Sequence, residues 1–170
     1  MKLSEKTIKA IRELQGIYPE KKSALLPALH LAQSEKGCLS SDVQTEVALL
    51  FDIAPSEVKS VVSFYDMFHE EPVGKHILHV CKNASCMLRG ADCILKKICE
   101  KLGCEPHGTT EDGEFTVIPS ECLAACDKAP MMLVDDKVVG PIKEEDIDRI
   151  LEEAKKGHGH PSPIQLDEVT

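Results

Sequence analysis

The spacing of apolar residues changes once along this chain, close to His76. Before that point apolar residues recur every three or four positions, which is the period of a helix with one buried face. After it, short apolar runs separated by turn residues are typical of strands. The sequence therefore predicts an α+β protein with a helical bundle over residues 1–73, a mixed domain over 74–156 and a flexible Gly- and Pro-containing tail over 157–170.

Capping and turn residues predict four helices in the first region. Ser23 is expected to cap the second helix, which places Pro27 in its opening turn, where no intrahelical donor is lost. Ser41 and Gln44 have the spacing of a capping box for the third helix, and Pro55 suits the first position of the fourth.

The second region predicts the order strand, helix, three strands, helix. A helix over residues 87–102 is expected to bury a stripe that begins at Leu88 and to stop at Gly103, and a final helix is expected from about Lys143. The expected strands are His76 to Val80, Phe115 to Ile118, Met131 to Val134 and Lys137 to Val139, the last two joined as a hairpin through Asp135 and Asp136.

The charge of the chain makes nucleic acid a poor partner. The 170 residues include 20 basic and 29 acidic side chains, which gives a net charge of −9. The part up to Lys75 holds 9 basic and 11 acidic residues, and the rest holds 11 and 18, so neither part offers the positive surface that a phosphate backbone requires. A DNA-binding helix-turn-helix between Ser41 and Tyr65 is for that reason only a remote alternative.

The sequence contains neither an apolar run of membrane-spanning length nor a secretory signal at its amino terminus. We therefore expect a cytoplasmic protein without direct membrane insertion. In such a reducing compartment the eight cysteines of the chain are more often metal ligands or small core residues than disulfides.

Four of the cysteines form two spaced pairs. Cys81 and Cys86 form C-x4-C, Cys122 and Cys126 form C-x3-C, and 35 residues separate the pairs. Each pair stands where an expected strand gives way to a loop, so the four thiols could converge. Cys86 is expected at a helix amino terminus, where the helix dipole favours a thiolate.

Three kinds of site compete for these cysteines. A structural zinc site usually has pairs two to four residues apart, often C-x2-C, so this spacing is off the common pattern. A thioredoxin-type redox pair would need C-x-x-C, which this region lacks. An iron–sulfur cluster held by four thiolates is plausible on chemistry, although the spacing differs from plant-type ferredoxins.

Several runs of the sequence resemble the 24 kDa (NuoE-type) subunit family of NADH:quinone oxidoreductase, respiratory complex I. They are Val61-Val62-Ser63-Phe64-Tyr65, Val80-Cys81, Ser85-Cys86, Glu121-Cys122-Leu123-Ala124-Ala125-Cys126 and Ala129-Pro130. The resemblance extends from about Ile11 to Leu151. It implies a thioredoxin-like [2Fe-2S] ferredoxin domain after the helical region, with one [2Fe-2S] cluster bound by Cys81, Cys86, Cys122 and Cys126.

The resemblance also implies a partner. The sequence has neither a dinucleotide-binding glycine motif nor a phosphate-binding loop, so it shows no complete catalytic site of its own. In the family, FMN and NADH are bound by a larger flavoprotein subunit (NuoF-type) on which this subunit docks, and the complex attaches it peripherally to a membrane. Equivalent subunits of NAD-linked hydrogenases, including electron-bifurcating ones, or of formate dehydrogenases are the alternative, and a zinc-stabilised adaptor is a remote one.

One residue of the second cysteine loop departs from the family pattern. Many members have glycine where this chain has Ala124. Because glycine alone adopts positive φ freely, the alanine affects which backbone geometry this loop adopts without strain.

The charges around the cysteines act in two directions on the cluster. Glu121, Asp127 and the acidic second region disfavour adding an electron to an anionic cluster, which predicts a low reduction potential. Lys82, Arg89 and Lys128 act the other way.

The remaining candidate residues are given structural roles. Cys99 is expected in the core, Cys38, Cys93 and Cys104 as incidental thiols, and His76 and His79 as strand residues rather than Rieske-type ligands. His158 and His160 in the tail are a weak metal signal. Phe64 and Tyr65 are expected in the helix core first, with contact to a partner as the second possibility.

Overall fold

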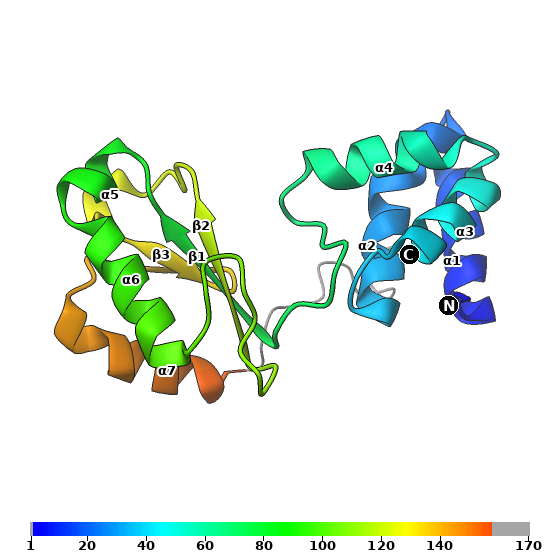
Figure 1. Ribbon diagram of the computed structural model, residues 1–170. Coiled ribbons are helices and arrows are strands. Elements are labelled where there is room, and N and C mark those ends of the chain that lie inside the picture. The colour runs from blue at the N-terminus through cyan, green and yellow to red at the C-terminus, as the bar shows by residue number, and fades with distance from the viewer. Residues whose placement is uncertain (1, 158–170) are drawn as a thin grey trace. The chain divides into compact units, whose positions relative to one another are not determined.

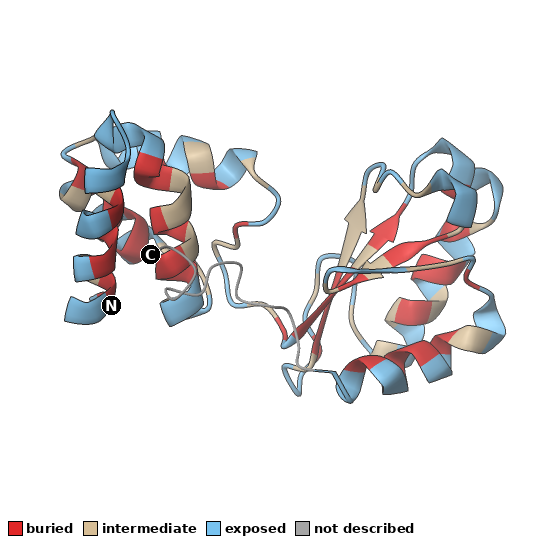
Figure 2. Cartoon of the chain, turned by 180° about the vertical axis from the view of Figure 1, so that it is seen from behind, coloured by how far each residue is buried: buried red, intermediate tan, exposed pale blue. Residues whose placement is uncertain are grey.

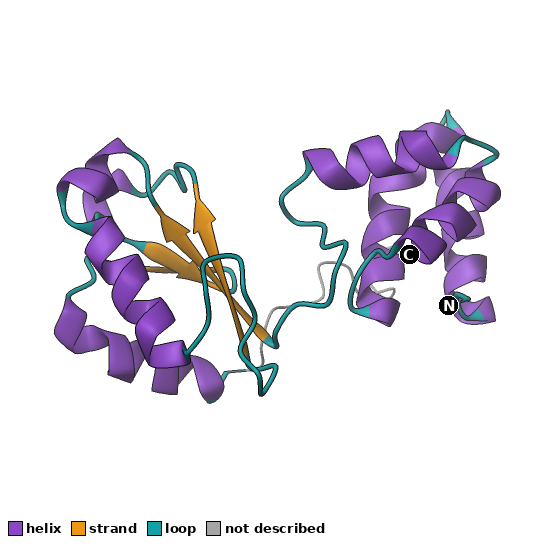
Figure 3. Cartoon of the chain, in the orientation of Figure 1, coloured by secondary structure: helices purple, strands orange, loops and turns teal. Residues whose placement is uncertain are grey.

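The computed structural model describes residues 2–157 and divides the chain into two compact units, one ending at Pro72 and the other beginning at Val73. Helices alone make up the regular structure described in the first unit, whereas the second combines helices with a sheet (Figure 3). This is the α+β organisation that the sequence predicts. The expected tail lies outside the described residues from His158 onward.

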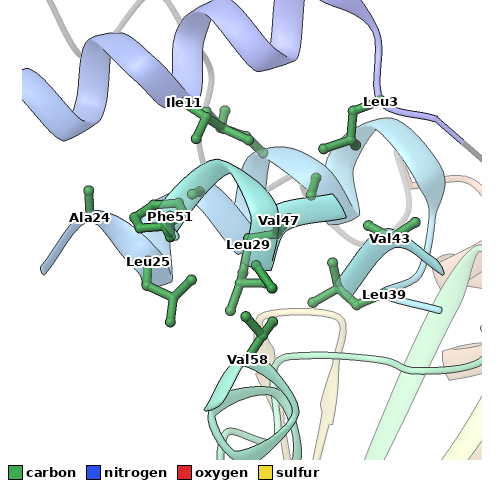
Figure 4. Close-up of a cluster of buried hydrophobic side chains, with 14 of the residues drawn as sticks. Leu3, Ile11, Ala24, Leu25, Leu29, Leu39, Val43, Val47, Phe51 and Val58 are labelled. Carbon is green, nitrogen blue, oxygen red and sulfur yellow. The ribbon is translucent and has the colours of Figure 1, made fainter. Parts of the chain in front are cut away.

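The first unit is a small helical bundle. Its elements are the helices α1 (Glu5–Ile17), α2 (Leu25–Lys36), α3 (Ser41–Phe51) and α4 (Pro55–Phe64), with a 3-10 turn (Lys21–Ala24) before α2 (Figure 1). One apolar stripe from each helix points inward, and Figure 4 shows side chains such as Ile11, Leu29 and Val47 meeting in the middle. Burial of these stripes, rather than helix propensity, stabilises helices of this length.

Two of the predicted helix caps are wrong. Ser23 lies inside the 3-10 turn, and the residue before α2 is Ala24, whose side chain makes no capping bond; Pro27 does fall in the opening turn. The cap of α3 is Ser40, and Gln44 is buried and donates to the Leu39 carbonyl over 2.7 Å instead of closing a capping box. A buried amide takes the nearest unpaired carbonyl because leaving either group unsatisfied costs more than a surface cap gains.

Phe64 and Tyr65 are adjacent at the end of α4 but differ in burial. Val58 and Val62 are buried, and Tyr65 packs partly against the core. Phe64, by contrast, is 76% exposed; its ring makes an edge-on contact with Tyr65, at 5.0 Å between ring centroids. The expectation that Phe64 belongs to the core is therefore wrong.

The second unit is built on a four-stranded sheet within the described residues. Its strands are β1 (His76–Cys81), β2 (Phe115–Ser120), β3 (Met132–Val134) and β4 (Lys137–Val139), in the order β2-β1-β3-β4. β1 and β2 are parallel, with His76 opposite Phe115 and Cys81 opposite Ser120, whereas β3 is antiparallel to both of its neighbours. The parallel pair requires a crossover, which the intervening helices supply.

Helices cover one face of the sheet. Alternate strand residues, including Leu78, Val80 and Val117, share a single core with α6 (Ala91–Leu102) and α7 (Ile147–Lys155). Figure 2 shows the buried stripes of these helices and strands in red. A 3-10 turn (Glu144–Asp146) leads into α7, which matches the helix expected from about Lys143. None of the described helices has the length and apolarity that crossing a bilayer requires.

The helix predicted over residues 87–102 is two helices. A short helix, α5 (Ala84–Leu88), ends before Gly90, and α6 begins after it. Gly90 has a φ of 87°, in the left-handed region that interrupts a right-handed helix. Leu88 is consequently 82% exposed, so its expected place on the buried stripe is wrong.

The β3–β4 hairpin turns at Asp135, which has a φ of 55°. Its carboxylate accepts a hydrogen bond from the Ile77 N–H at 2.9 Å and lies 3.0 Å from Nδ1 of the buried His76. His79 Nδ1 lies 3.0 Å from the Ser120 hydroxyl. Both histidines therefore tie neighbouring segments of the sheet together, as expected of strand residues.

Candidate metal centre

The two cysteine pairs lie at one edge of the sheet because their strands run in the same direction. Cys81 is the last residue of β1, and the loop with Cys122 and Cys126 follows directly after β2. The carboxyl ends of parallel strands face the same edge, where ligand sites of mixed α/β sheets are found. Cys86 then reaches this edge from the short helix α5.

The pairs differ in exposure. Cys81 and Cys86 are 3% and 2% exposed, and they share a small apolar cluster with Ala129 and Met131. Cys122 and Cys126 are exposed, with 3.9 Å between their Sγ atoms. One pair therefore faces the protein interior, and the other faces outward from the same edge.

Met131 connects the inner pair to the sheet. Its carbonyl accepts a hydrogen bond from the Cys81 N–H at 3.2 Å, and its backbone donates to the Cys86 sulfur. Burial raises the pKa of Cys86, and contact with Cys81 and the nearby Cys126 raises it further, while the Met131 bond lowers it. Burial, not the helix dipole expected from the sequence, therefore dominates the pKa of this thiol.

Polar contacts tie the two cysteine loops to each other. Asn83 caps α5 by accepting from the Ala84 N–H, and its side-chain amide donates to Glu121 over 3.0 Å. Arg89 donates to the Ala129 carbonyl at 3.3 Å, next to the outer pair. The sequence identified Glu121 and Arg89 as charged neighbours of the cysteines. The pairing of Asn83 with Glu121 across the loops depends on the strand register.

The outer loop contains the departure noted at Ala124. This residue has a φ of 60° and an exposed side chain. The loop therefore uses the conformation that glycine adopts without strain, but with alanine in place. The predicted link between this position and positive φ is confirmed.

A two-iron cluster and a closed zinc site make different demands on four thiols. Within residues 2–157, no three or more His, Cys, Asp or Glu side chains gather into a group that could hold one metal ion. A two-iron cluster takes four cysteine thiolates, two for each iron, so two separate pairs at one edge suit it. A closed zinc site needs four ligands around one point.

The other four cysteines, which are Cys38, Cys93, Cys99 and Cys104, are not part of the two pairs. Cys93 is exposed on α6 and Cys38 is half-buried after α2. Cys99 packs against the second core, as expected. Cys104 packs there too, although no place in the core is expected for it from the sequence. His158 and His160 lie outside the described residues.

This combination of sheet, helices and paired cysteines is that of a thioredoxin-like [2Fe-2S] ferredoxin, and the model of the family so described matches residues 11–155. The second E-type subunit of NADH-quinone oxidoreductase from Rhizobium meliloti is 41% identical over 135 residues, which cover 79% of this chain and 80% of the relative. The E-type subunit from Pseudomonas aeruginosa is 31% identical over 88% of this chain and 90% of the relative. The chain therefore belongs to the thioredoxin-like [2Fe-2S] ferredoxin family, together with these two relatives.

A solved structure shows the same fold at lower identity. An NAD+-reducing [NiFe]-hydrogenase in the H2-reduced state matches with a TM-score of 0.66 and 23% identity, over 86% of this chain but only 23% of the hydrogenase chain. At that identity the likeness concerns the fold alone. The resemblance, the fold class and the single [2Fe-2S] cofactor expected from the sequence are confirmed by the family match, and the NADH-quinone oxidoreductase relatives support the expected role as an electron-transfer subunit of complex I.

Proposed function

We propose that Cys81, Cys86, Cys122 and Cys126 hold the [2Fe-2S] cluster of this chain and that it serves as an electron-transfer subunit beside the FMN- and NADH-binding flavoprotein subunit of NADH:quinone oxidoreductase. The observation that carries the proposal is the position of both cysteine pairs at the carboxyl edge of two parallel strands. When bound, the cluster accepts and releases one electron at a time.

The chain's own residues hold and shield the site. Met131 and Ala129 cover the inner cysteines with apolar surface, which keeps water from one side of the site. The hydrogen bond from Asn83 to Glu121 links the two loops that carry the cysteines. The exposed outer pair leaves a face open toward a partner, which an electron carrier without a catalytic site of its own requires.

The surface around the inner pair suits such a partner. Met87 and Leu88, which follow Cys86 directly, are 52% and 82% exposed. Adjacent exposed apolar side chains are typical of protein contact sites. The exposed Arg89 follows them directly in the sequence, so a partner surface that offers an acidic group beside an apolar centre fits this segment.

Serine variants test the ligand assignment. We expect Cys86→Ser combined with Cys126→Ser to abolish stable cluster binding, measured as iron, acid-labile sulfide and the low-temperature EPR signal after anaerobic purification. Cys38→Ser and Cys93→Ser are matched controls that should keep full iron content. Retention of iron and of the EPR signal by the double variant would refute the assignment.

Co-purification tests the complex. Recovery of a flavoprotein subunit together with membrane subunits and quinone reductase activity would support the proposal, including a peripheral position of this chain on the membrane through the complex. Recovery of a hydrogenase or a formate dehydrogenase subunit instead would replace complex I with that alternative.

A further inference from the structure

Two cysteines outside the cluster site meet at the end of α6. Gly103, with a φ of 66°, ends the helix, and the Cys104 N–H donates to the Cys99 carbonyl at 3.2 Å. This bond is the hallmark of a Schellman motif, which brings the side chains of its first and last residues together. The thiols of Cys99 and Cys104 are close enough that each affects the pKa of the other.

The paired thiols line a cleft rather than a closed core. The cleft has a volume of about 520 Å³, and both cysteines contribute to its wall. Leu95 and Pro106 provide apolar surface beside them. The charged side chains of the lining are those of Asp92, Glu100 and Glu105, which outnumber the single positive charge of Lys96. A ligand reaching the thiols therefore meets sulfur and hydrocarbon together with a negative field, which favours neutral, sulfur-seeking species over anions.

We propose that Cys99 and Cys104 form a dithiol site that binds neutral trivalent arsenicals through two sulfur–arsenic bonds. The proposal goes beyond the electron-transfer function and does not rest on it. Soft thiolate ligands prefer soft elements, and two adjacent sulfurs satisfy arsenic that already carries one organic group. A third protein ligand is not needed, which agrees with a site containing only two cysteines.

Thiol chemistry separates this role from disulfide exchange. Burial and the nearby Cys104 and Glu105 raise the pKa of Cys99 to about 11, and burial also raises the pKa of Cys104. Attack on a disulfide needs a thiolate, which these environments disfavour. In the overall condensation with an arsenic oxide, the protons of both thiols are transferred to the leaving oxygen.

The binding step balances without an oxidant. An arsenic–oxygen double bond and two S–H bonds break, two As–S bonds form, and the oxygen leaves with both protons as one water. Arsenic stays trivalent, and neither sulfur is oxidised. A small-molecule dithiol reverses the reaction by exchange.

Phenylarsine oxide is the probe, because its ring can lie on Leu95 and Pro106. The full chain with its cluster is titrated, adducts are counted by native mass spectrometry, and cluster absorbance is followed in parallel. We expect one adduct per chain at low excess, with Cys99 and Cys104 protected from maleimide and released by dimercaptopropanol. Cys99→Ala and Cys104→Ala should each weaken adduct formation at least tenfold, whereas Cys38→Ala and Cys93→Ala should not.

Two results would overturn the proposal. One is equal adduct formation in the Cys99→Ala/Cys104→Ala double variant. The other is uptake in the wild type that leaves Cys99 and Cys104 open to maleimide and proceeds only as the cluster absorbance falls. Peptide mapping of the wild type needs no variant, so the test holds even where a substitution unfolds the chain. Failure here leaves the cluster assignment untouched, because that assignment is read from iron content.

Discussion

The side-chain amide of Asn83 donates a hydrogen bond to the Glu121 carboxylate over 3.0 Å, which joins the loop after β1 to the loop after β2. The same side chain caps α5 by accepting from the Ala84 N–H at 2.9 Å. One residue thus fixes both the start of the helix that carries Cys86 and the separation of the two cysteine pairs.

Substitutions at Asn83 separate these two roles. Asn83→Ala removes both and should cost about 1 kcal/mol of unfolding free energy, together with faster loss of iron to a chelator. Asn83→Ser keeps a capping oxygen but not the amide donor, so it should restore most of the stability while iron loss stays fast. Equal iron-release rates for Asn83→Ser and wild type would show that the Glu121 bond does not hold the loops together.

Ala124→Gly should stabilise the protein. A left-handed φ costs an L-residue about 1–2 kcal/mol. The greater freedom of glycine in the unfolded chain offsets about 0.5–1 kcal/mol of that strain relief, so the unfolding free energy should rise by about 0.5–1 kcal/mol. The side chain is exposed, so no cavity is left. Ala125, with a φ of −120°, is the matched control: Ala125→Gly should destabilise. Denaturant unfolding of the cluster-loaded chain measures both variants.

Gln33 joins the segment after α4 to the helical bundle. Its amide donates to the Met67 carbonyl at 2.9 Å and accepts from the His69 N–H at 2.8 Å, and the residue is 7% exposed. Gln33→Leu removes the side-chain hydrogen bonds of two backbone groups and should cost about 2–4 kcal/mol, with much faster hydrogen exchange at the His69 amide. Gln33→Glu keeps a side-chain oxygen that accepts from the His69 N–H, so the hydrogen exchange of that amide should be slower than in Gln33→Leu. In the control Gln15→Leu, one bond to the Leu50 carbonyl is lost and the cost should be near 1 kcal/mol.

Glu35 makes the stability of the helical bundle depend on pH. Partial burial opposes its ionisation, but bonds from Lys36, Thr7 and Ser4 outweigh burial and lower its pKa to about 2 from an unfolded value of 4.5. A lowered folded pKa contributes stability above pH 4.5 that is lost as the pH falls toward 2. Glu35→Gln should therefore cost about 1–2 kcal/mol at pH 7, and the difference from wild type should shrink through that acid window.

The control for Glu35 is Glu13, whose exposed carboxylate lies 3.8 Å from Lys9. Glu13→Gln should change the unfolding free energy by less than about 0.5 kcal/mol at any pH in the same series. A Glu35→Gln difference that stays constant between pH 7 and pH 2.5 would mean that its hydrogen bonds do not depend on the charge.

Leu88 tests the proposed docking face. Leu88→Lys places a charge on an apolar contact surface and should weaken association with the flavoprotein subunit at least tenfold, measured by co-purification or surface plasmon resonance. Because the side chain is 82% exposed, iron content and thermal stability should not change. Val138→Lys on β4, where the side chain is 42% exposed, is the matched control and should bind normally. Unchanged binding by the Leu88 variant would move the interface elsewhere.

The sequence predicts most elements of the fold because each has its own apolar periodicity and its own capping or turn residues. The four strands lie within one or two residues of their expected ends, and Pro55 begins α4 as its fixed φ favours. The wrong helix caps and boundaries are at Ser23, Gln44 and Leu88, and the burial of Phe64 and Cys104 also differs from expectation. At each of these residues the tertiary environment overrides a local rule. Gly90 is an example: its left-handed φ interrupts a helix whose apolar spacing continues through it.

Residue types and their spacing are enough to identify the groups that are chemically equipped for the site: four cysteines in two spaced pairs, and an alanine where the loop favours glycine. The burial of Cys81 and Cys86, the exposure of Cys122 and Cys126, and the proximity of Cys99 and Cys104 emerge only in the folded chain. This division arises because residue type and spacing act over a few positions along the chain. Exposure and thiol contacts, in contrast, depend on strand register and on where a helix ends, which bring distant segments together.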